Sequence, residues 1–215
     1  MDTAPPGSGP GEFALLETMR LDQGRLRRLE RHIARAAAAA RDFDYAWNEA
    51  AVREALARVE ASHAEGCWRA RLLVSREGVP ALECTPHDPS AEGRWRVGFA
   101  PEPIDERDPF ILHKTTRRAV YDRARASRPD LDDVLLWNGR GEVTEATVGN
   151  VVAEIDGVRW TSPLHCGLLG GTFRGEQLDA GTIRERVLTP ADVRSASRLW
   201  IINSVREWVD AMLVV

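Results

Sequence analysis

Residues 101–118 are PEPIDERDPFILHKTTRR, and they separate two differently patterned parts of the chain. The prolines at positions 101, 103 and 109 interrupt regular structure, because proline lacks a backbone N–H and has a fixed φ angle. Runs that are typical of strands and helices lie on both sides of this stretch. We therefore place a domain boundary at 101–110 and predict two α+β domains, residues 12–103 and residues 104–215.

The first predicted domain begins after residues 1–11, MDTAPPGSGPG, which are too rich in proline and glycine to form a core and are expected to be a flexible tail or linker. The alanine run 36–40 favours a helix, and Asn48 is the expected N-cap of a second helix. We expect strands and helices in this order: a strand at 13–20, a turn at 22–24 into a second strand, helices at 29–43 and 48–61, and antiparallel strands at 68–75, 79–85 and 94–100.

The second predicted domain begins with a helix and continues as a meander. Gly170-Gly171-Thr172-Phe173-Arg174 is expected to be a loop that opens a helix, and Pro190 suits the first position of another helix. The expected elements are a helix at 116–127, strands at 134–137, 142–147, 151–155 and 158–161, helices ending near 181 and starting near 189, and strands at 200–204 and 209–215.

The composition excludes several classes of protein. The formal charge of −4 argues against a nucleic-acid partner, and no apolar run approaches the ~20 residues that span a bilayer. The three cysteines form no Cys-x-x-Cys pair and the five histidines have no metal-ligand spacing, so we expect no metal site. A cytoplasmic protein with reduced thiols is the simplest interpretation.

Only one of the 29 positively charged side chains is a lysine, Lys114. Arginine can replace lysine in ion pairs, but the guanidinium does not deprotonate and cannot attack a carbonyl as an amine does. The alternative is that one lysine survives a strong arginine bias by chance on a solvated face. The composition therefore points to Schiff-base chemistry at Lys114 without excluding chance.

A Schiff-base lysine usually serves pyridoxal 5′-phosphate (PLP), and this cofactor needs three further groups. Its phosphate needs an arginine and backbone N–H groups at a helix N-terminus. Its pyridine nitrogen needs an acidic partner, and its lysine must also act as an acid and base. The chain offers a candidate for each of these groups.

Three stretches of the sequence carry further motifs: Glu145-Ala146-Thr147-Val148-Gly149-Asn150, Gly167–Arg174 and His32-Ile33-Ala34-Arg35. They are similar, in this order, to the Glu-x-(small)-x-x-Asn, Leu-Pro-Gly-(aliphatic)-x-Arg and His-x-x-Arg motifs of the class IV aminotransferase family, the fold-type IV PLP enzymes. Residues 13–215 resemble this family. The resemblance implies a two-domain fold like that of D-amino acid aminotransferase, and a homodimer.

The resemblance also implies roles for individual residues. Lys114 would form the Schiff base with PLP and move the proton, with Thr18 as a helper on the substrate side. Glu145 would pair with the pyridine nitrogen and Arg35 would bind the phosphate. The other residues implied to bind the cofactor are Asn150, Gly171, Thr172, Phe173, Asn203 and Ser204.

Within the family, the chain is most similar to aminodeoxychorismate lyases and to the lyase domain fused to aminodeoxychorismate synthase component I. Leu16–Arg20 resembles their Phe-Glu-Thr-(apolar)-Arg segment, and Lys114–Arg118 their Lys-x-x-Asn-Arg segment with Arg117 in place of asparagine. The implied function is a 4-amino-4-deoxychorismate lyase that gives 4-aminobenzoate and pyruvate, with a synthase as a possible partner.

Two alternatives stay open. One is a PLP-dependent transaminase of D- or branched-chain amino acids, and the other is a catalytically silent PLP-fold domain. The second rests on the absence of the family's Asp-Arg-Gly-x-x-Tyr-Gly-Asp-Gly loop before the threonine. Gly170 and Glu207 also depart from the family pattern, which has proline and glycine at these positions.

Overall fold

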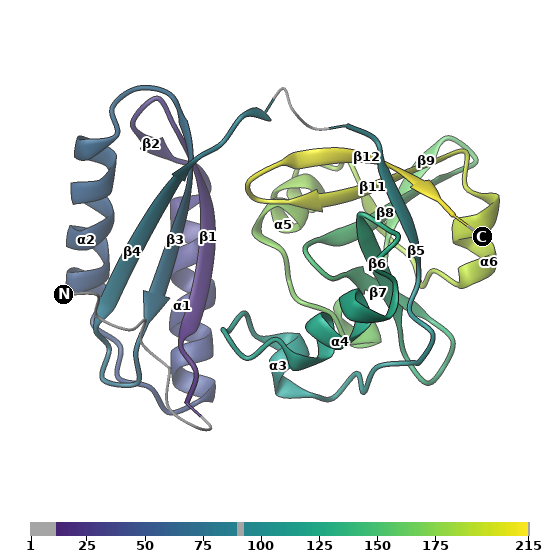
Figure 1. Cartoon of the computed structure of the whole chain (residues 1–215), viewed down its shortest axis with the longest axis horizontal. Helices are drawn as coiled ribbons and strands as arrows, with labels where there is room; N and C mark the ends of the chain where they lie inside the picture. Colours follow the sequence, from purple (N-terminus) through teal and green to yellow (C-terminus); the bar gives the residue numbers. More distant parts are fainter. Residues whose placement is uncertain (1–11, 90–92, 215) are drawn as a thin grey trace. The chain divides into compact units, whose positions relative to one another are not determined.

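The computed structural model describes residues 12–89 and 93–214, which form two compact units (Figure 1). Residues 12–89 and His113–Arg117 belong to the first unit, and residues 93–112 and 118–214 belong to the second. The flexible tail predicted at residues 1–11 lies outside the described residues. Each unit has its own sheet, so the chain is an α+β protein as predicted.

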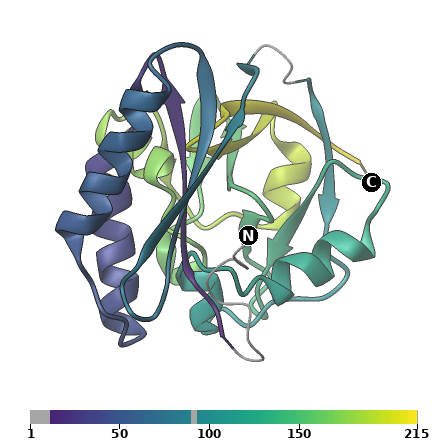
Figure 2. The same cartoon turned by 60° about the vertical axis from the view of Figure 1, so that its left-hand side comes forward.

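The first unit is an antiparallel sheet with the strand order β2-β1-β3-β4. Two helices lie side by side on one face of this sheet, as Figure 2 shows. The elements are β1 (Leu15–Asp22), β2 (Arg25–Leu26), α1 (Leu29–Asp42), α2 (Glu49–Ser62), β3 (Cys67–Val74) and β4 (Pro80–Pro86).

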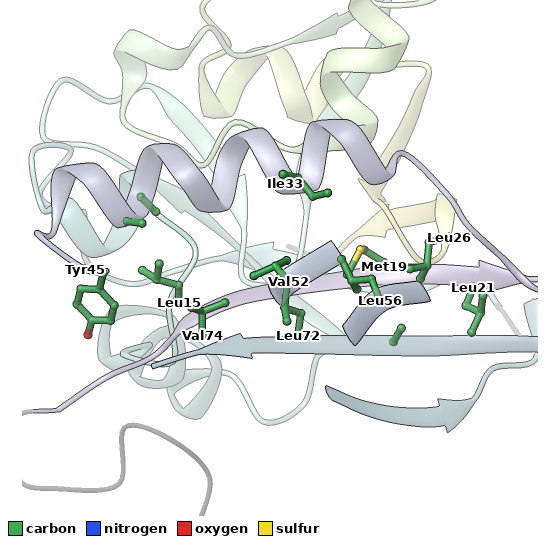
Figure 3. Close-up of a cluster of buried hydrophobic side chains, with 13 residues drawn as sticks. Leu15, Met19, Leu21, Leu26, Ile33, Tyr45, Val52, Leu56, Leu72 and Val74 are labelled. Carbon is green, nitrogen blue, oxygen red and sulfur yellow. The ribbon is translucent and has the colours of Figure 1, made fainter. Parts of the chain in front are cut away.

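The core of the first unit follows from the alternation of side chains along β1. Leu15, Met19 and Leu21 are buried on the face that α1 and α2 cover, where they meet Ile33 of α1 and Leu56 of α2 (Figure 3). This pattern of alternate apolar residues is what a strand with one buried face requires.

Both helices of the first unit lie within one residue of their predicted ranges. Asn48 is the N-cap of α2, as predicted, and its side chain accepts a hydrogen bond from the Ala51 N–H at 3.1 Å. The alanine run of α1 packs its small side chains against the sheet, which allows the helix and the strands to approach closely.

The second unit is built on a mixed sheet in which the described strands have the order β10-β9-β8-β11-β12-β5-β6-β7. The strands β5 and β6, β5 and β12, and β9 and β10 are parallel pairs. The elements are β5 (Trp95–Phe99), α3 (Pro109–Leu112), α4 (Ala119–Ser127), β6 (Asp133–Trp137), β7 (Val143–Ala146), β8 (Asn150–Ile155), β9 (Val158–Thr161), η2 (Leu164–Cys166), α5 (Thr172–Asp179), β10 (Arg184–Glu185), α6 (Pro190–Ser195), β11 (Arg198–Asn203) and β12 (Glu207–Leu213).

The units divide the chain differently from the predicted domains 12–103 and 104–215. The strand at Trp95–Phe99 belongs to the second unit, because it pairs with β6 and β12 rather than with β4. Lys114 belongs to the first unit, because its segment pairs with β1. Both differences arise from pairings between residues that are distant in sequence, which local pattern does not reveal.

The helix expected from residue 116 begins at Ala119 instead. The Thr116 N–H donates to the Ala14 carbonyl oxygen at 2.9 Å, so this residue is part of an extended pairing and not of a helical turn.

In the described part of the chain, no helix combines the length and the apolar character that crossing a bilayer would require.

Candidate active site

Lys114 is held beside β1 by backbone hydrogen bonds on both sides. The Leu16 N–H donates to the Lys114 carbonyl oxygen at 3.0 Å, and the Thr116 N–H donates to the Ala14 carbonyl oxygen at 2.9 Å. A further bond, from the Ala14 N–H to Thr116 Oγ1 at 2.9 Å, closes the pairing. The position of the lysine backbone is therefore set by the first strand of the chain.

The same pairing brings Lys114 and Thr18 to one face of the sheet. Leu15 and Thr115 form an antiparallel bridge, and both side chains are buried, with exposed fractions of 1% and 2%. Because side chains alternate along extended segments, Lys114 lies on the opposite face, which it shares with Leu16 and Thr18. An amine and a hydroxyl that the sequence predicts to act together thus share a surface.

The other face of β1 carries a buried polar cluster beneath α1. Glu17 lies in the same alternate series as Leu15 and Met19, but it is a carboxylate that is only 2% exposed. Arg35 donates two hydrogen bonds to it, from Nε to Oε1 at 2.8 Å and from Nη2 to Oε2 at 2.6 Å. His32 Nδ1 lies 2.6 Å from Oε2. Glu17 thus fixes the orientation of Arg35, the predicted phosphate ligand.

The charges in this cluster follow from burial and pairing. Burial is the largest single influence on Glu17 and opposes its ionisation, but Arg35 and His32 together outweigh it and lower the pKa of the carboxyl group to about 2. Burial lowers the pKa of His32 although Glu17 opposes this change, so the imidazole is neutral at pH 7. Because an ionised carboxylate only accepts hydrogen bonds, we assign the imidazole proton to Nδ1.

Glu145 of β7, the predicted partner of the pyridine nitrogen, lies in the second unit and is 3% exposed. The Tyr121 hydroxyl donates to Glu145 Oε1 at 2.8 Å, and the Leu169 N–H approaches the same oxygen at 3.3 Å. Burial, and then the Glu145 charge, raise the pKa of Tyr121 well above its ordinary value. The phenol therefore keeps its proton and remains a donor to Glu145.

The predicted phosphate loop precedes α5. A Cβ atom at Gly171 would lie 2.0 Å from Asn150 Oδ1, so only glycine fits at this position. Asn150 is itself fixed, because its Nδ2 donates to the Leu169 carbonyl oxygen at 2.9 Å. Gly171 is the N-cap of α5 and contributes no side-chain cap, and Thr172 and Phe173 are buried in the first turn. A helix N-terminus of this kind favours an anion.

Asn203 and Ser204 lie in the turn after β11. Asn203 Oδ1 accepts hydrogen bonds from the N–H groups of Val205 and Arg206, at 3.0 and 2.9 Å. Asn203 Nδ2 donates to the Val148 carbonyl oxygen at 3.3 Å, which links this turn to the segment between Glu145 and Asn150. The second unit thus brings together the predicted residues of β7, β8, α5 and β11.

The structure explains one of the two departures from the family pattern. Glu207 has a φ angle of 61°, in the left-handed region where glycine carries no steric cost and other residues lose ~1–2 kcal/mol. Gly170 has no such need, because a Cβ atom there would make only an ordinary contact, 3.7 Å from a Leu164 methyl group.

The available groups fit PLP by their chemistry. The first unit supplies the amine of Lys114 and the guanidinium of Arg35, and the second supplies the Glu145 carboxylate and a helix N-terminus at Gly171. The absence of a Cβ atom at Gly171 lets the Asn150 side chain pack directly against the start of α5. These are the groups that the aldehyde, phosphate and pyridine nitrogen of PLP require.

Glu17, His32 and Tyr121 have no role in the site predicted from the sequence. A signal for Glu17 was present, since the alternation of Leu15, Met19 and Leu21 places residue 17 on the buried face of the strand. Nothing local to Tyr121 predicts its bond to Glu145, because the two residues come from α4 and β7 and meet only in the fold.

Comparisons with known proteins concern the family and the fold of the chain. The family model described as amino-transferase class IV matches residues 14–212. A curated protein of Schizosaccharomyces pombe named "Putative aminodeoxychorismate lyase" is 30% identical over 213 residues, which are 95% of this chain and 91% of that protein.

Two solved structures have similar folds. The "Putative amino-acid aminotransferase from Mesorhizobium loti" is 36% identical, with a TM-score of 0.87, and the match covers 94% of this chain and 100% of that one. The 4-amino-4-deoxychorismate lyase from Pseudomonas aeruginosa has a TM-score of 0.78 at 22% identity, with coverage of 93% and 82%. The second match shows the fold alone.

Proposed function

The chain belongs to the class IV aminotransferase family, and we propose that within this family it is a PLP-dependent 4-amino-4-deoxychorismate lyase. The observation that carries this proposal is the 30% identity to a protein named as such a lyase, over nearly the full length of both. The shared sheet face of Lys114 and Thr18 supports it, because the lyase-like segment Leu16–Arg20 contributes the hydroxyl that lies on the face of the lysine.

In this proposal, bound PLP supplies an electron sink that makes the amine-bearing carbon of the substrate acidic. The Lys114 amine takes the proton from that carbon, and the carbon–oxygen bond to the enolpyruvyl group breaks. The ring becomes aromatic as 4-aminobenzoate, and the departing enolate becomes pyruvate when it takes up a proton, which the protonated Lys114 amine can return. Thr18 lies on the face of Lys114 and is our candidate to donate a hydrogen bond to the departing oxygen.

The other predicted site residues would bind the cofactor and orient it. Glu145 would pair with the pyridine nitrogen and keep it protonated, while Arg35 and the backbone at Gly171–Phe173 would bind the phosphate. The bidentate bond from Arg35 to Glu17 holds the guanidinium in a fixed orientation. Pairing to β1 holds the Lys114 backbone in the same way.

A second candidate is amino transfer from D- or branched-chain amino acids. The structure from Mesorhizobium loti, which is 36% identical, is named as an amino-acid aminotransferase and favours this alternative. The two reactions differ after the proton leaves the substrate. A lyase expels a carbon–oxygen leaving group, whereas a transaminase returns the proton to the cofactor and releases a keto acid.

The experiment that separates them measures products from matched substrates. The protein, supplied with PLP, is incubated with aminodeoxychorismate, and separately with D-alanine or leucine plus a keto acid. We expect 4-aminobenzoate and pyruvate in equal amounts from the first incubation, and amino transfer at least tenfold slower, which corresponds to ~1.4 kcal/mol in the barrier. Faster amino transfer would establish the transaminase, and no product from any of these three substrates would contradict both proposed activities.

A further inference from the structure

Tyr121 has no role in the proposed reaction, yet it makes the shortest described hydrogen bond to Glu145. Its ring is part of an apolar cluster with Ile111, Val134 and Leu136. Its hydroxyl points out of that cluster and donates to Glu145 Oε1 at 2.8 Å. The Ile111 carbonyl oxygen lies farther from the hydroxyl, at 3.4 Å. A buried phenol thus ends on the carboxylate that is proposed to meet the pyridine nitrogen.

The ring of Tyr121 is held in place by Arg118. The Arg118 guanidinium lies 4.5 Å from the ring centroid, a cation–π arrangement. The same guanidinium donates through Nη2 to the Thr147 carbonyl oxygen at 2.5 Å. Arg118 therefore connects the start of α4 to the backbone just after Glu145. This connection helps to fix the distance between the Tyr121 and Glu145 side chains.

Two donors converge on a single oxygen of Glu145. The terminal torsion of a glutamate is broad, so the carboxylate plane is not fixed by the side chain itself. Tyr121 and the Leu169 N–H both approach Oε1, at 2.8 and 3.3 Å, and together they select one rotation of that plane. Because the pKa of Tyr121 is raised well above its ordinary value, the phenol donates over the whole working pH range.

We propose that Tyr121 is a positioning residue that orients the Glu145 carboxylate toward the pyridine nitrogen of PLP. The proposal rests on the proposed function, in which the chain binds PLP with Glu145 at that nitrogen. In this proposal Tyr121 acts only through Glu145, which its hydroxyl contacts directly. Its contribution therefore depends on the presence of the ring nitrogen.

This dependence gives a test that needs no turnover. The apo-protein is titrated with PLP and with the analogue in which a carbon atom replaces the ring nitrogen, and the ratio of the two dissociation constants is measured. Both compounds carry the same aldehyde and phosphate, so the contributions of Lys114 and Arg35 cancel in the ratio. Any loss of folded protein cancels as well.

We expect the wild-type protein to prefer PLP, and Tyr121→Phe to reduce that preference about tenfold, which corresponds to ~1.4 kcal/mol. Phenylalanine keeps the ring in its cluster and under Arg118. Glu145→Gln should reduce the preference at least as much. Tyr121→Phe combined with Glu145→Gln should add little further, because both changes remove the same interaction.

Tyr45→Phe is the matched control, because Tyr45 is the other tyrosine of the chain and its hydroxyl donates to the Phe13 carbonyl oxygen at 2.5 Å in the first unit. This variant should leave the ratio unchanged. Equal weakening of both compounds in Tyr121→Phe would show a merely structural role and overturn the proposal, as would an unchanged ratio.

Failure of the proposed function has a different signature. If the wild-type protein binds PLP and the analogue equally, and Glu145→Gln changes neither affinity, then Glu145 does not meet the ring nitrogen. If the protein binds neither compound, it is not a PLP protein. Both results overturn the role of Tyr121 together with the role of Glu145. A selective loss in Glu145→Gln without one in Tyr121→Phe overturns only the role of Tyr121.

Discussion

Replacing Glu17 by glutamine should destabilise the protein strongly at neutral pH and much less in acid. The variant keeps the size of the side chain, but it removes the charge and replaces one accepting oxygen by an amide NH2, which only donates hydrogen bonds. Arg35 would then lack the buried carboxylate that now accepts two of its hydrogen bonds. Removing one partner of a buried ion pair is costly because the remaining charge is not compensated.

The magnitude follows from the pKa of Glu17, which the folded state lowers from an ordinary value of 4.5 to about 2. Each pH unit between these values corresponds to ~1.4 kcal/mol, so the ionised carboxylate stabilises the folded state by roughly 3 kcal/mol. Because the folded pKa is the lower one, this contribution is complete above pH 4.5 and is lost as the pH falls through about 2. At about pH 3, less than half of it should remain.

The assay is urea denaturation of the wild type and of Glu17→Gln, followed by circular dichroism at about pH 7 and at about pH 3. Hydrogen exchange of the β1 amides assigns the loss to the first unit. Glu83→Gln is the control, because Glu83 pairs with Arg71 at 3.2 Å on the same sheet but is 54% exposed. The control should differ little from the wild type at either pH. A difference for Glu17→Gln below ~1 kcal/mol at neutral pH, or one that does not shrink in acid, would refute the reasoning.

Three further predictions concern the cofactor. With PLP added, the wild type should absorb visible light, and Lys114→Ala and Lys114→Arg should not, because neither side chain offers an amine that can deprotonate; a spectrum of each protein decides this. Glu145→Gln should keep the absorption but lower the turnover of aminodeoxychorismate by ~10²-fold or more, measured as pyruvate release. Gly171→Ala should weaken PLP binding in an apo-protein titration, because its Cβ atom would lie 2.0 Å from Asn150 Oδ1, whereas Gly170→Ala, with its nearest contact at 3.7 Å, should bind PLP as the wild type does. Equal affinities for the two glycine variants would contradict the close fit at residue 171.

The sequence predicted the parts of the fold that local physics determines. The helices 29–43 and 48–61 form because alanine favours the helix and Asn48 caps its N-terminus. The strand at Trp95–Phe99 was predicted as a strand but assigned to the wrong sheet. Its parallel partners are distant in the chain, and no local pattern distinguishes an edge of one sheet from the interior of another.

The same distinction applies to the candidate site. Glu145, Gly171 and Asn150 belong to short motifs whose spacing is visible in the sequence, and the second unit brings them together. Tyr121 is joined to Glu145 by the packing of α4 against the sheet, which no motif encodes. The buried position of Glu17 could have been predicted from the sequence, since a carboxylate in an otherwise apolar alternate series must find buried partners.

The position of Lys114 bears on why the chain retains one lysine. Arginine supplies the cations of the ion pairs at the surface, such as Arg53 with Glu30 and Glu49, so charge alone does not explain a lysine. Chance survival would be expected on a solvated face, but Lys114 is only partly exposed and directly precedes the buried Thr115. The backbone of Lys114 is paired to β1, on the sheet face that carries Thr18. A side chain retained at such a position is better explained by the chemistry of an amine, which a guanidinium cannot supply.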